Sequence, residues 1–230
     1  MFNRISIDND TQWHKVRGAH LQASEAASAL DCSPWMTSPE LYDEKVGAVK
    51  RKDIGDKPYV RYGKRMEPLI RAQVEVEFPC FRIDYHEYDI LESVERPWQG
   101  CTLDGELEVV SENPWNLPIG AKGVLEIKTG SFRRESDLDE WNDGIPQHYY
   151  CQVIHQLAVT GYRFAIVVAR LKRDAFKDSD NGFPEIVQRC AYIDATTKEV
   201  KDDIKALNEE EAVFWKRVQE RKRPPIKVWL

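Results

Sequence analysis

Residues 100–110 read GCTLDGELEVV and residues 123–130 read GVLEIKTG, and these two stretches decide the expected fold. Both carry the aliphatic and β-branched residues that are typical of short strands. Turn sequences with asparagine, proline and glycine lie between them, so we expect the strands to pair as an antiparallel hairpin. The pairing would bring Asp104, Glu126 and Lys128 to one end of a sheet. Glu126 and Lys128 would share a face, because residues two apart in a strand point the same way.

Asp104, Glu126 and Lys128 are the residue types of a hydrolytic metal site. Two carboxylates a few ångströms apart repel each other unless a cation lies between them, and oxygen ligands suit Mg²⁺ or Mn²⁺. A lysine beside such an ion is placed to hold or deprotonate a water molecule. A metal can lower the pKa of that water and stabilise the charge that develops on a phosphoryl oxygen. The pattern therefore predicts metal-assisted hydrolysis of a phosphodiester.

The Glu-x-Lys tripeptide alone carries little information. It occurs again at 199–201 and 220–222, in charged sequence that is typical of solvated helix. The copy at Glu126 differs because it lies in an apolar strand that follows an Asp-Gly strand. An exposed hairpin with ordinary surface charges is the alternative for these two strands, so other motifs are needed to decide.

Length and charge limit what the chain can be. Its 230 residues suffice for one large α/β domain over 1–230. The net charge of −6 gives no global basic field, so a DNA-binding surface must be local. The five scattered cysteines lack a Cys-x-x-Cys pair, and we expect reduced, buried thiols in a cytoplasmic protein. We expect neither a signal segment nor a membrane span.

Helical and strand patterns alternate along the chain. Four segments have apolar residues at helical spacing or begin at a proline, namely 39–46, 59–78, 146–159 and 196–221. Four others have the composition of strands, namely 81–83, 88–91, 164–169 and 186–193. Residues 131–143 are polar and are expected to form a loop over the site.

Glu67 lies beside the expected core face of the helix over 59–78, which includes Leu69, Ile70 and Val74. A glutamate at the edge of a buried face needs a partner, and a metal ion or an arginine would serve. Taken alone, Glu67 is better interpreted as an ordinary glutamate at the rim of a helix.

Two further groups of polar residues suggest contacts with phosphate. Ser24 is expected to cap a short helix that ends near Leu30, and a helix N-terminus with Arg17 nearby favours an anion. The alternative, which these residues alone favour, is that Ser24 only caps and Arg17 is only solvated. Arg133 and Arg134 could reach a phosphate backbone, although solvated loop charges are an equally good interpretation.

Gln152 lies next to the apolar stripe of the helix over 146–159. A side-chain amide in that position should be satisfied by a specific partner. The order along the chain is therefore a helix with a glutamate, a hairpin with Asp and Glu-x-Lys, a helix with glutamine, and then more sheet.

This order of motifs resembles the PD-(D/E)xK nucleases, and within them the lambda-exonuclease-like (YqaJ-type) viral recombinases. The resemblance spans roughly Gln12 to Val168, whereas the C-terminal third matches only in general character. Its motifs are WHKVR at 13–17 with ASE at 23–25, GKRME at 63–67, LDG at 103–105, LEIK at 125–128, and Ile145-Pro146 with Tyr149 and Gln152.

The resemblance implies a restriction-endonuclease-like core, with a central mixed β-sheet flanked by helices. It implies that Asp104, Glu126 and the backbone carbonyl of Ile127 bind Mg²⁺, with Mn²⁺ as a substitute. Glu67 would complete this site or hold a second ion. Lys128 would position and activate the attacking water.

Other roles implied by the resemblance concern the substrate. Gln152 would orient the scissile phosphate or Lys128, with Tyr149 nearby, while Arg17 and Ser24 would hold a terminal 5′-phosphate. Family members are 5′→3′ exonucleases that act on the ends of double-stranded DNA. They are often homotrimeric rings, and they usually work beside a single-strand annealing recombinase.

Two other functions stay open. One is a structure-specific or restriction-type endonuclease on the same core. The other is a module that binds DNA ends without cutting them. The presence of all four of Asp104, Glu126, Lys128 and Glu67 disfavours the second, since the loss of one would have favoured it.

Overall fold

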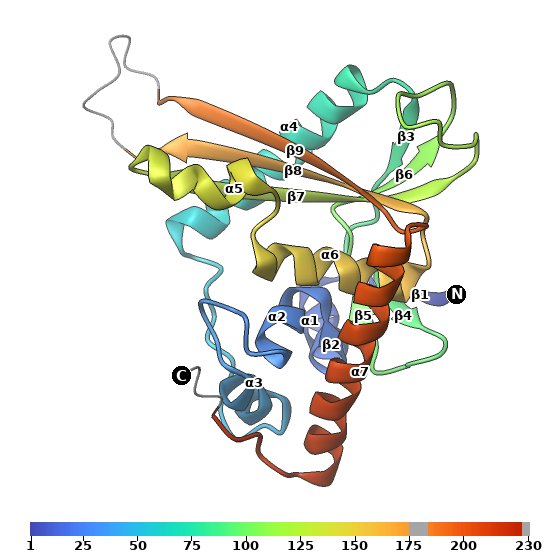
Figure 1. Cartoon of the computed structure of the whole chain (residues 1–230). Coiled ribbons are helices and arrows are strands. Elements are labelled where there is room, and N and C mark those ends of the chain that lie inside the picture. Colours follow the sequence, from blue (N-terminus) through green and yellow to red (C-terminus); the bar gives the residue numbers. More distant parts are fainter. Residues whose placement is uncertain (175–183, 227–230) are drawn as a thin grey trace.

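The computed structural model describes residues 1–174 and 184–226, whose strands form two sheets (Figure 1). The four-stranded sheet has the order β1 (Phe2–Ile5), β4 (Ile90–Ser93), β5 (Gln99–Cys101) and β2 (Leu21–Gln22). The five-stranded sheet has the order β3 (Phe81–Asp84), β6 (Gly105–Val109), β7 (Lys122–Phe132), β8 (Phe164–Arg173) and β9 (Ile186–Asp194). The larger sheet is the expected central mixed sheet, and the smaller one was not expected.

Helices cover both faces of the five-stranded sheet, with α4 on one face and α6 on the other (Figure 1). The helical elements are α1 (Asp10–Gly18), η1 (Ala23–Glu25), α2 (Ala26–Ala29), α3 (Ser38–Lys45), α4 (Pro58–Glu77), η2 (Glu135–Leu138), α5 (Asp139–Asp143), α6 (Gln147–Thr160) and α7 (Lys198–Glu220). The helices predicted over 39–46, 59–78, 146–159 and 196–221 correspond to α3, α4, α6 and α7.

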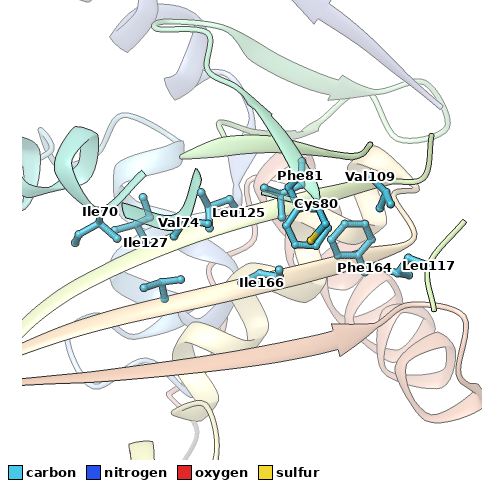
Figure 2. Close-up of a cluster of buried hydrophobic side chains, with 12 residues drawn as sticks. Ile70, Val74, Cys80, Phe81, Val109, Leu117, Leu125, Ile127, Phe164 and Ile166 are labelled. Atoms are coloured by element: carbon cyan, nitrogen blue, oxygen red, sulfur yellow. The ribbon is translucent and has the colours of Figure 1, made fainter. Parts of the chain in front are cut away.

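Side chains of β7 alternate between two buried clusters. Leu125 and Ile127 pack with Ile70 of α4 in the cluster that Figure 2 shows. Val124 packs in the other cluster, with Ile154 of α6. Since alternate residues of a strand share a face, the side chains that follow Val124 at steps of two are directed toward α6.

β7 pairs differently with its two neighbours. It is antiparallel to β6, with Gly105 opposite Leu125, as the hairpin prediction requires. It is parallel to β8, and a parallel pair needs a long crossover, which η2, α5 and α6 provide. The two strands approach closely at Gly123, where a Cβ atom would lie 2.4 Å from the ring of Phe164. The crossover places α6 over the strand that carries the Glu-x-Lys motif.

The strand expected from Gly100 onward is interrupted. β5 ends at Cys101 in the four-stranded sheet, and β6 begins at Gly105 in the five-stranded sheet. Residues 102–104 link the two, so Asp104 lies in the link and not within a strand. The chain changes sheets here because β5 pairs with β4 and β2, whereas β6 pairs with β3 and β7.

The loop expected over 131–143 is wrong. β7 continues to Phe132, which pairs with Arg173 and packs with Leu138 and Leu171 in a buried cluster. The helical elements η2 and α5 then fill the rest of the segment. Apolar residues spaced through this polar sequence bury themselves against the end of β8 and so impose regular structure on it.

The expected cap at Ser24 is also wrong, because Ser24 lies inside η1. The N-terminus of η1 is capped at Gln22, whose backbone N–H donates to the side chain of Glu25 at 2.9 Å. The helix α1 before it was not predicted; its cap is Asn9, whose side chain accepts from the N–H of Gln12.

Some expected positions of single residues differ from the structure. Leu69 is 61% exposed, because only Ile70 and Val74 of the expected stripe on α4 turn fully inward. Cys190 is an exposed free thiol on β9. The strand expected from Tyr88 begins at Ile90, because Tyr88 adopts a positive φ of 63°.

The C-terminal helix α7 begins within two residues of its predicted start. Thr197 caps it by accepting from the N–H of Val200, and Arg221 ends it in the left-handed conformation. Leu207 and Phe214 are buried on its inner face. Among the helices of the described residues, none combines the length and the apolar character that a membrane span requires.

Candidate active site

Glu126 lies at the centre of the site, with 2% of its side chain exposed. Its Oε1 accepts from Lys128 Nζ at 2.6 Å and from Gln152 Nε2 at 2.7 Å. Its Oε2 accepts from Gln156 Nε2 at 2.5 Å. A buried carboxylate is stable only when it is paired and hydrogen-bonded, and these three donors also fix its orientation.

Lys128 lies on the same face of β7 as Glu126, as predicted. Its Nζ donates to Gln152 Oε1 at 2.8 Å and lies 4.7 Å from the ring centroid of Tyr149. Burial alone would lower the pKa of Lys128, but the carboxylates of Glu126 and Asp104 outweigh it and raise the pKa above its usual value. Lys128 is therefore a fully charged ammonium group between acidic partners and an aromatic face.

Asp104 approaches these residues from the link between the sheets. Its Oδ2 accepts from the backbone N–H of Ile127 at 2.7 Å, and its backbone carbonyl accepts from Arg71 Nε at 2.7 Å. Burial raises the pKa of Asp104 well above its usual value, and the nearby charges of Glu126 and Glu67 raise it further. The carboxylates of the site therefore crowd one another.

The backbone carbonyl of Ile127 is directed into the same space. Within a strand, the N–H and the C=O of one residue point to the same side. The N–H of Ile127 donates to Asp104, so its carbonyl also points toward the edge of β7 that faces β6. β6 begins only at Gly105, opposite Leu125, and does not reach Ile127.

The oxygen atoms of Asp104, Glu126 and Ile127 fit a hard divalent cation. Crowded carboxylates are the environment that such an ion relieves. Among residues 1–174 and 184–226, no three histidine, cysteine, aspartate or glutamate side chains converge to enclose an ion. Two carboxylates and one carbonyl leave coordination positions for water, and Mg²⁺ ordinarily keeps several of its waters.

Glu67 approaches from α4, on the opposite side of the sheet from α6. Burial raises its pKa; Arg71 opposes this effect and Glu126 adds to it. It makes no hydrogen bond to a residue that the structure describes. Glu67 thus adds negative charge near Asp104 and Glu126 without contacting either of them through a hydrogen bond.

Arg17 lies beside the link that carries Asp104. Its Nη2 donates to Ser24 Oγ at 2.8 Å, and its Nη1 lies 3.4 Å from Thr102 Oγ1. Its guanidinium packs 4.7 Å from the ring of Trp13. Burial lowers the pKa of Arg17, which the charge of Glu25 partly opposes. No carboxylate in the described part of the chain forms a salt bridge with it, so its direct polar partners are hydroxyl groups.

Arg133 and Arg134 are not brought to the carboxylates. Their backbone N–H groups donate to Asp137 Oδ2, and the Arg133 side chain, 82% exposed, lies 3.3 Å from Asp174. Arg133 follows Lys128 by five residues, about 16 Å along an extended strand. These arginines therefore lie past the far end of β7.

Gln156 is the contact that sequence reasoning missed. It follows Gln152 by four residues on α6, so both amides reach Glu126 from one face of the helix. The signal was present in the spacing, but a glutamine inside an apolar stripe gives no indication of which strand lies opposite it.

Residues 12–163 match the model of the YqaJ-like viral recombinase domain. The chain belongs to this family. The matched segment contains Asp104, Glu126, Lys128 and Gln152, whose contacts form the site. No curated protein matches the chain in sequence.

The fold of this YqaJ-family chain is found in solved nuclease structures. LHK-Exo in complex with dAMP is 17% identical, with a TM-score of 0.59 over 93% of this chain and 97% of that one. The alkaline exonuclease LHK-Exo from Laribacter hongkongensis is 16% identical, with a TM-score of 0.57 over the same shares. The KSHV SOX RNA complex is 10% identical, with a TM-score of 0.50 over 94% and 72%. The fold is thus restriction-endonuclease-like, and family and fold together support a nuclease that acts on DNA.

Proposed function

We propose that this YqaJ-family chain is a Mg²⁺-dependent 5′→3′ exonuclease that digests one strand of linear double-stranded DNA from its end. The observation that carries the proposal is the set of contacts around Glu126, in which one carboxylate binds Lys128, Gln152 and Gln156 while Asp104 is held beside it through Ile127. Carboxylates next to a charged amine, in a fold shared with exonucleases, support metal-assisted hydrolysis of a phosphodiester.

Asp104, Glu126 and the Ile127 carbonyl would hold Mg²⁺ or Mn²⁺. Glu67 would complete the site through water or hold a second ion, which fits its charge near the site and its lack of a hydrogen bond to the other carboxylates. A bound divalent cation supplies charge neutralisation and a lowered pKa for water.

Lys128 would hold the attacking water through its ammonium protons. Gln152 supports this role because it donates to Glu126 and accepts from Lys128, so a single amide sets the distance between the two. Tyr149 covers the side of the Lys128 ammonium that faces α6, and burial raises the pKa of this tyrosine, so its hydroxyl stays protonated at neutral pH.

Arg17 and Ser24 would bind the terminal 5′-phosphate. The guanidinium of Arg17 is held in place by two hydroxyl groups and a tryptophan ring, and none of them neutralises its charge. An arginine of this kind matches a phosphate, which accepts two parallel hydrogen bonds. Arg133 and Arg134, exposed past the end of β7, would contact the backbone of DNA further from the site.

We further propose that the whole chain acts as one nuclease domain within a homotrimeric ring, beside a single-strand annealing recombinase. Support for one domain comes from α7, whose buried Glu211 lies 2.8 Å from His155 of α6. A ring suits an acidic chain, because basic groups need to line only its channel. Sedimentation at several protein concentrations tests the subunit number.

The function is tested with linear duplexes labelled separately at the 5′ and 3′ ends, and with a closed circular duplex, in Mg²⁺ and in EDTA. We expect Mg²⁺-dependent release of the 5′ label from linear DNA and no digestion of the circle. Rapid cutting of the circle would favour the endonuclease alternative, and binding without cutting would favour the module that only grips DNA ends.

A further inference from the structure

Trp35 is a large aromatic side chain that has no role in the proposed reaction. It lies in the link between α2 and α3, and 69% of it is exposed. Single exposed apolar residues are common on protein surfaces, so exposure alone indicates nothing. Trp35 differs because its ring is packed edge-on against His148, with centroids 4.6 Å apart and planes at 84°.

The packing partners of Trp35 connect it to the candidate active site. Its ring centroid lies 5.9 Å from that of Tyr149. The ring of Tyr149 in turn lies 4.7 Å from Lys128 Nζ. On α5, Trp141 stacks on Tyr149 at 5.5 Å and 30°. A continuous set of aromatic rings therefore leads from the Lys128 ammonium to an indole that is open to solvent.

The backbone that carries Trp35 is anchored on both sides. The N–H of Trp35 donates to Ser33 Oγ at 3.3 Å, and the N–H of Ser38 donates to Asp31 Oδ1 at 2.6 Å. The next side chain, Met36, packs against a buried cluster beneath α3. The link passes the N-terminal end of α6, where His148 and Tyr149 lie (Figure 1). The indole is thus held in position before any ligand arrives, which lowers the entropy cost of binding.

The position of this indole suggests the ligand. Glu126 is 2% exposed, so a phosphodiester must come deep into the site to reach it, and a nucleotide that leaves the base stack of the duplex can do so more readily. The unpaired base then needs another aromatic surface. Stacking on an aromatic side chain supplies that surface for any base, which suits an enzyme that degrades every sequence.

We propose that Trp35 stacks on the unpaired nucleobase of a DNA nucleotide next to the scissile phosphate. This inference rests on the proposed function, because it places the scissile phosphate at Asp104 and Glu126. It assigns to the link between α2 and α3 a binding subsite for a base, separate from the groups that contact phosphate.

Binding of short DNA ends in Ca²⁺ in place of Mg²⁺ tests the subsite without turnover. The probes carry a single abasic nucleotide at each of the first positions in turn. For the parent protein we expect one abasic position to weaken binding about 10-fold, within the range for one stacked base. Trp35→Ala should bind intact DNA with about 10-fold lower affinity than the parent. An abasic nucleotide at that position should not lower the affinity of Trp35→Ala further. Trp35→Phe should keep most of the affinity, while Trp35→Leu should behave like Trp35→Ala.

Ile119→Ala is the matched control, because Ile119 is 72% exposed in the turn between β6 and β7 and lies away from the site. Equal losses for Trp35→Ala on intact and abasic DNA would overturn the inference, as would Trp35→Leu binding as well as Trp35→Phe. If the parent binds DNA but does not cut it in Mg²⁺, the proposed exonuclease fails and the binding series still decides the subsite. If it cuts and Trp35→Ala binds normally, only the subsite fails.

Discussion

The amide of Gln152 is fixed at both ends, since its nitrogen donates to Glu126 and its oxygen accepts from Lys128. The third side of this triangle is the Lys128–Glu126 ion pair at 2.6 Å. In such a closed arrangement each group orients the other two, so the loss of one takes a hydrogen-bond or ion-pair partner from each of the two that remain. Substitutions within the triangle will therefore be far from additive.

Lys128→Ala should lower the turnover of linear duplex by about 10³-fold, because the variant lacks the group that we propose holds the attacking water. DNA binding in Ca²⁺ should change little, because Lys128 lies inside the site. Lys122→Ala is the control on the same strand: Lys122 is partly exposed and pairs with Glu108. Comparable losses in both variants would point to damage to β7 rather than to the chemistry.

Arg17→Ala should slow digestion of 5′-phosphorylated ends by about 10- to 100-fold relative to the parent, the scale of charge-assisted hydrogen bonds. Ends with a 5′-hydroxyl should be affected much less. The measurement is the initial rate on the two kinds of end. Lys15→Ala, an exposed cation on the same helix, serves as control. An equal loss on both ends would remove the phosphate clamp from the proposal.

Several residues of the site could be predicted because they obey local rules. Two-residue spacing placed Glu126 and Lys128 on one face, and the contacts of both residues with α6 agree with it. Ser24 was wrongly predicted to be a cap because two residues compete for that role, and Gln22 with Glu25 satisfies the turn instead. No role could be assigned to Trp35 or Gln156 from the sequence, because their partners lie on elements distant in sequence.

At the scale of elements, α6 holds Glu126 in place through Gln152 and Gln156, which lie on successive turns of the helix. If Glu126 binds the metal ion as we propose, Gln156→Leu should weaken the affinity for Mn²⁺ or Mg²⁺ by about 10- to 100-fold, because loss of a group that orients a metal ligand lowers metal affinity by that factor. The side chain is fully buried and its Oε1 has no partner in the described part of the chain, so leucine should be accommodated. Titration of cleavage against Mn²⁺ measures the effect. Gln147→Leu, exposed on the same helix, should have no effect.

Glu25 joins three elements through buried charges. Its oxygens lie 2.7 Å from Lys45 Nζ of α3 and 2.8 Å from Arg51 Nη1 in the connector to α4. Burial raises the pKa of Glu25, but Lys45 and Arg51 outweigh it and lower the pKa below its usual value. This stabilising contribution is therefore present above the unfolded pKa, near about 4.3, and is lost as pH falls through the lower folded pKa.

Glu25→Gln should cost about 3–5 kcal/mol in the free energy of unfolding at neutral pH, because it leaves a buried lysine unpaired. The difference from the parent should shrink in acid, where Glu25 itself becomes neutral. Denaturant unfolding at several pH values measures it. Glu95→Gln is the control, because Glu95 is 75% exposed and its ion pair with Arg96 contributes little. A pH-independent difference would show that packing, not charge, is responsible.

Elements with strong periodicity could be predicted, and elements decided by distant pairing could not. The β6–β7 hairpin and the helices α4, α6 and α7 carry their own apolar patterns. The break at residues 102–104 depends on β4 and β2 pairing with β5, and the extension of β7 depends on β8. In both places, tertiary pairing between strands overrides the local propensity of the sequence.

At the scale of the molecule, a net charge of −6 requires DNA to be attracted by local groups. If Arg17, Arg133 and Arg134 each contact a phosphate, DNA affinity in Ca²⁺ should fall about 40-fold between about 50 and 200 mM salt. Removing Arg133 and Arg134 together should reduce the slope by about 2. A flat salt response would contradict backbone contacts by these groups.

The link at residues 102–104 joins one sheet to the other, and it carries Asp104, whereas Glu126 belongs to the middle of the larger sheet. The distance between the two carboxylates therefore depends on how the two sheets pack against each other. Leu103 packs into clusters on both sides of that junction and so helps to fix the distance between the two sheets. Slight loosening there would spoil cleavage in a chain that is still folded, which makes this junction the natural place to find heat-sensitive variants.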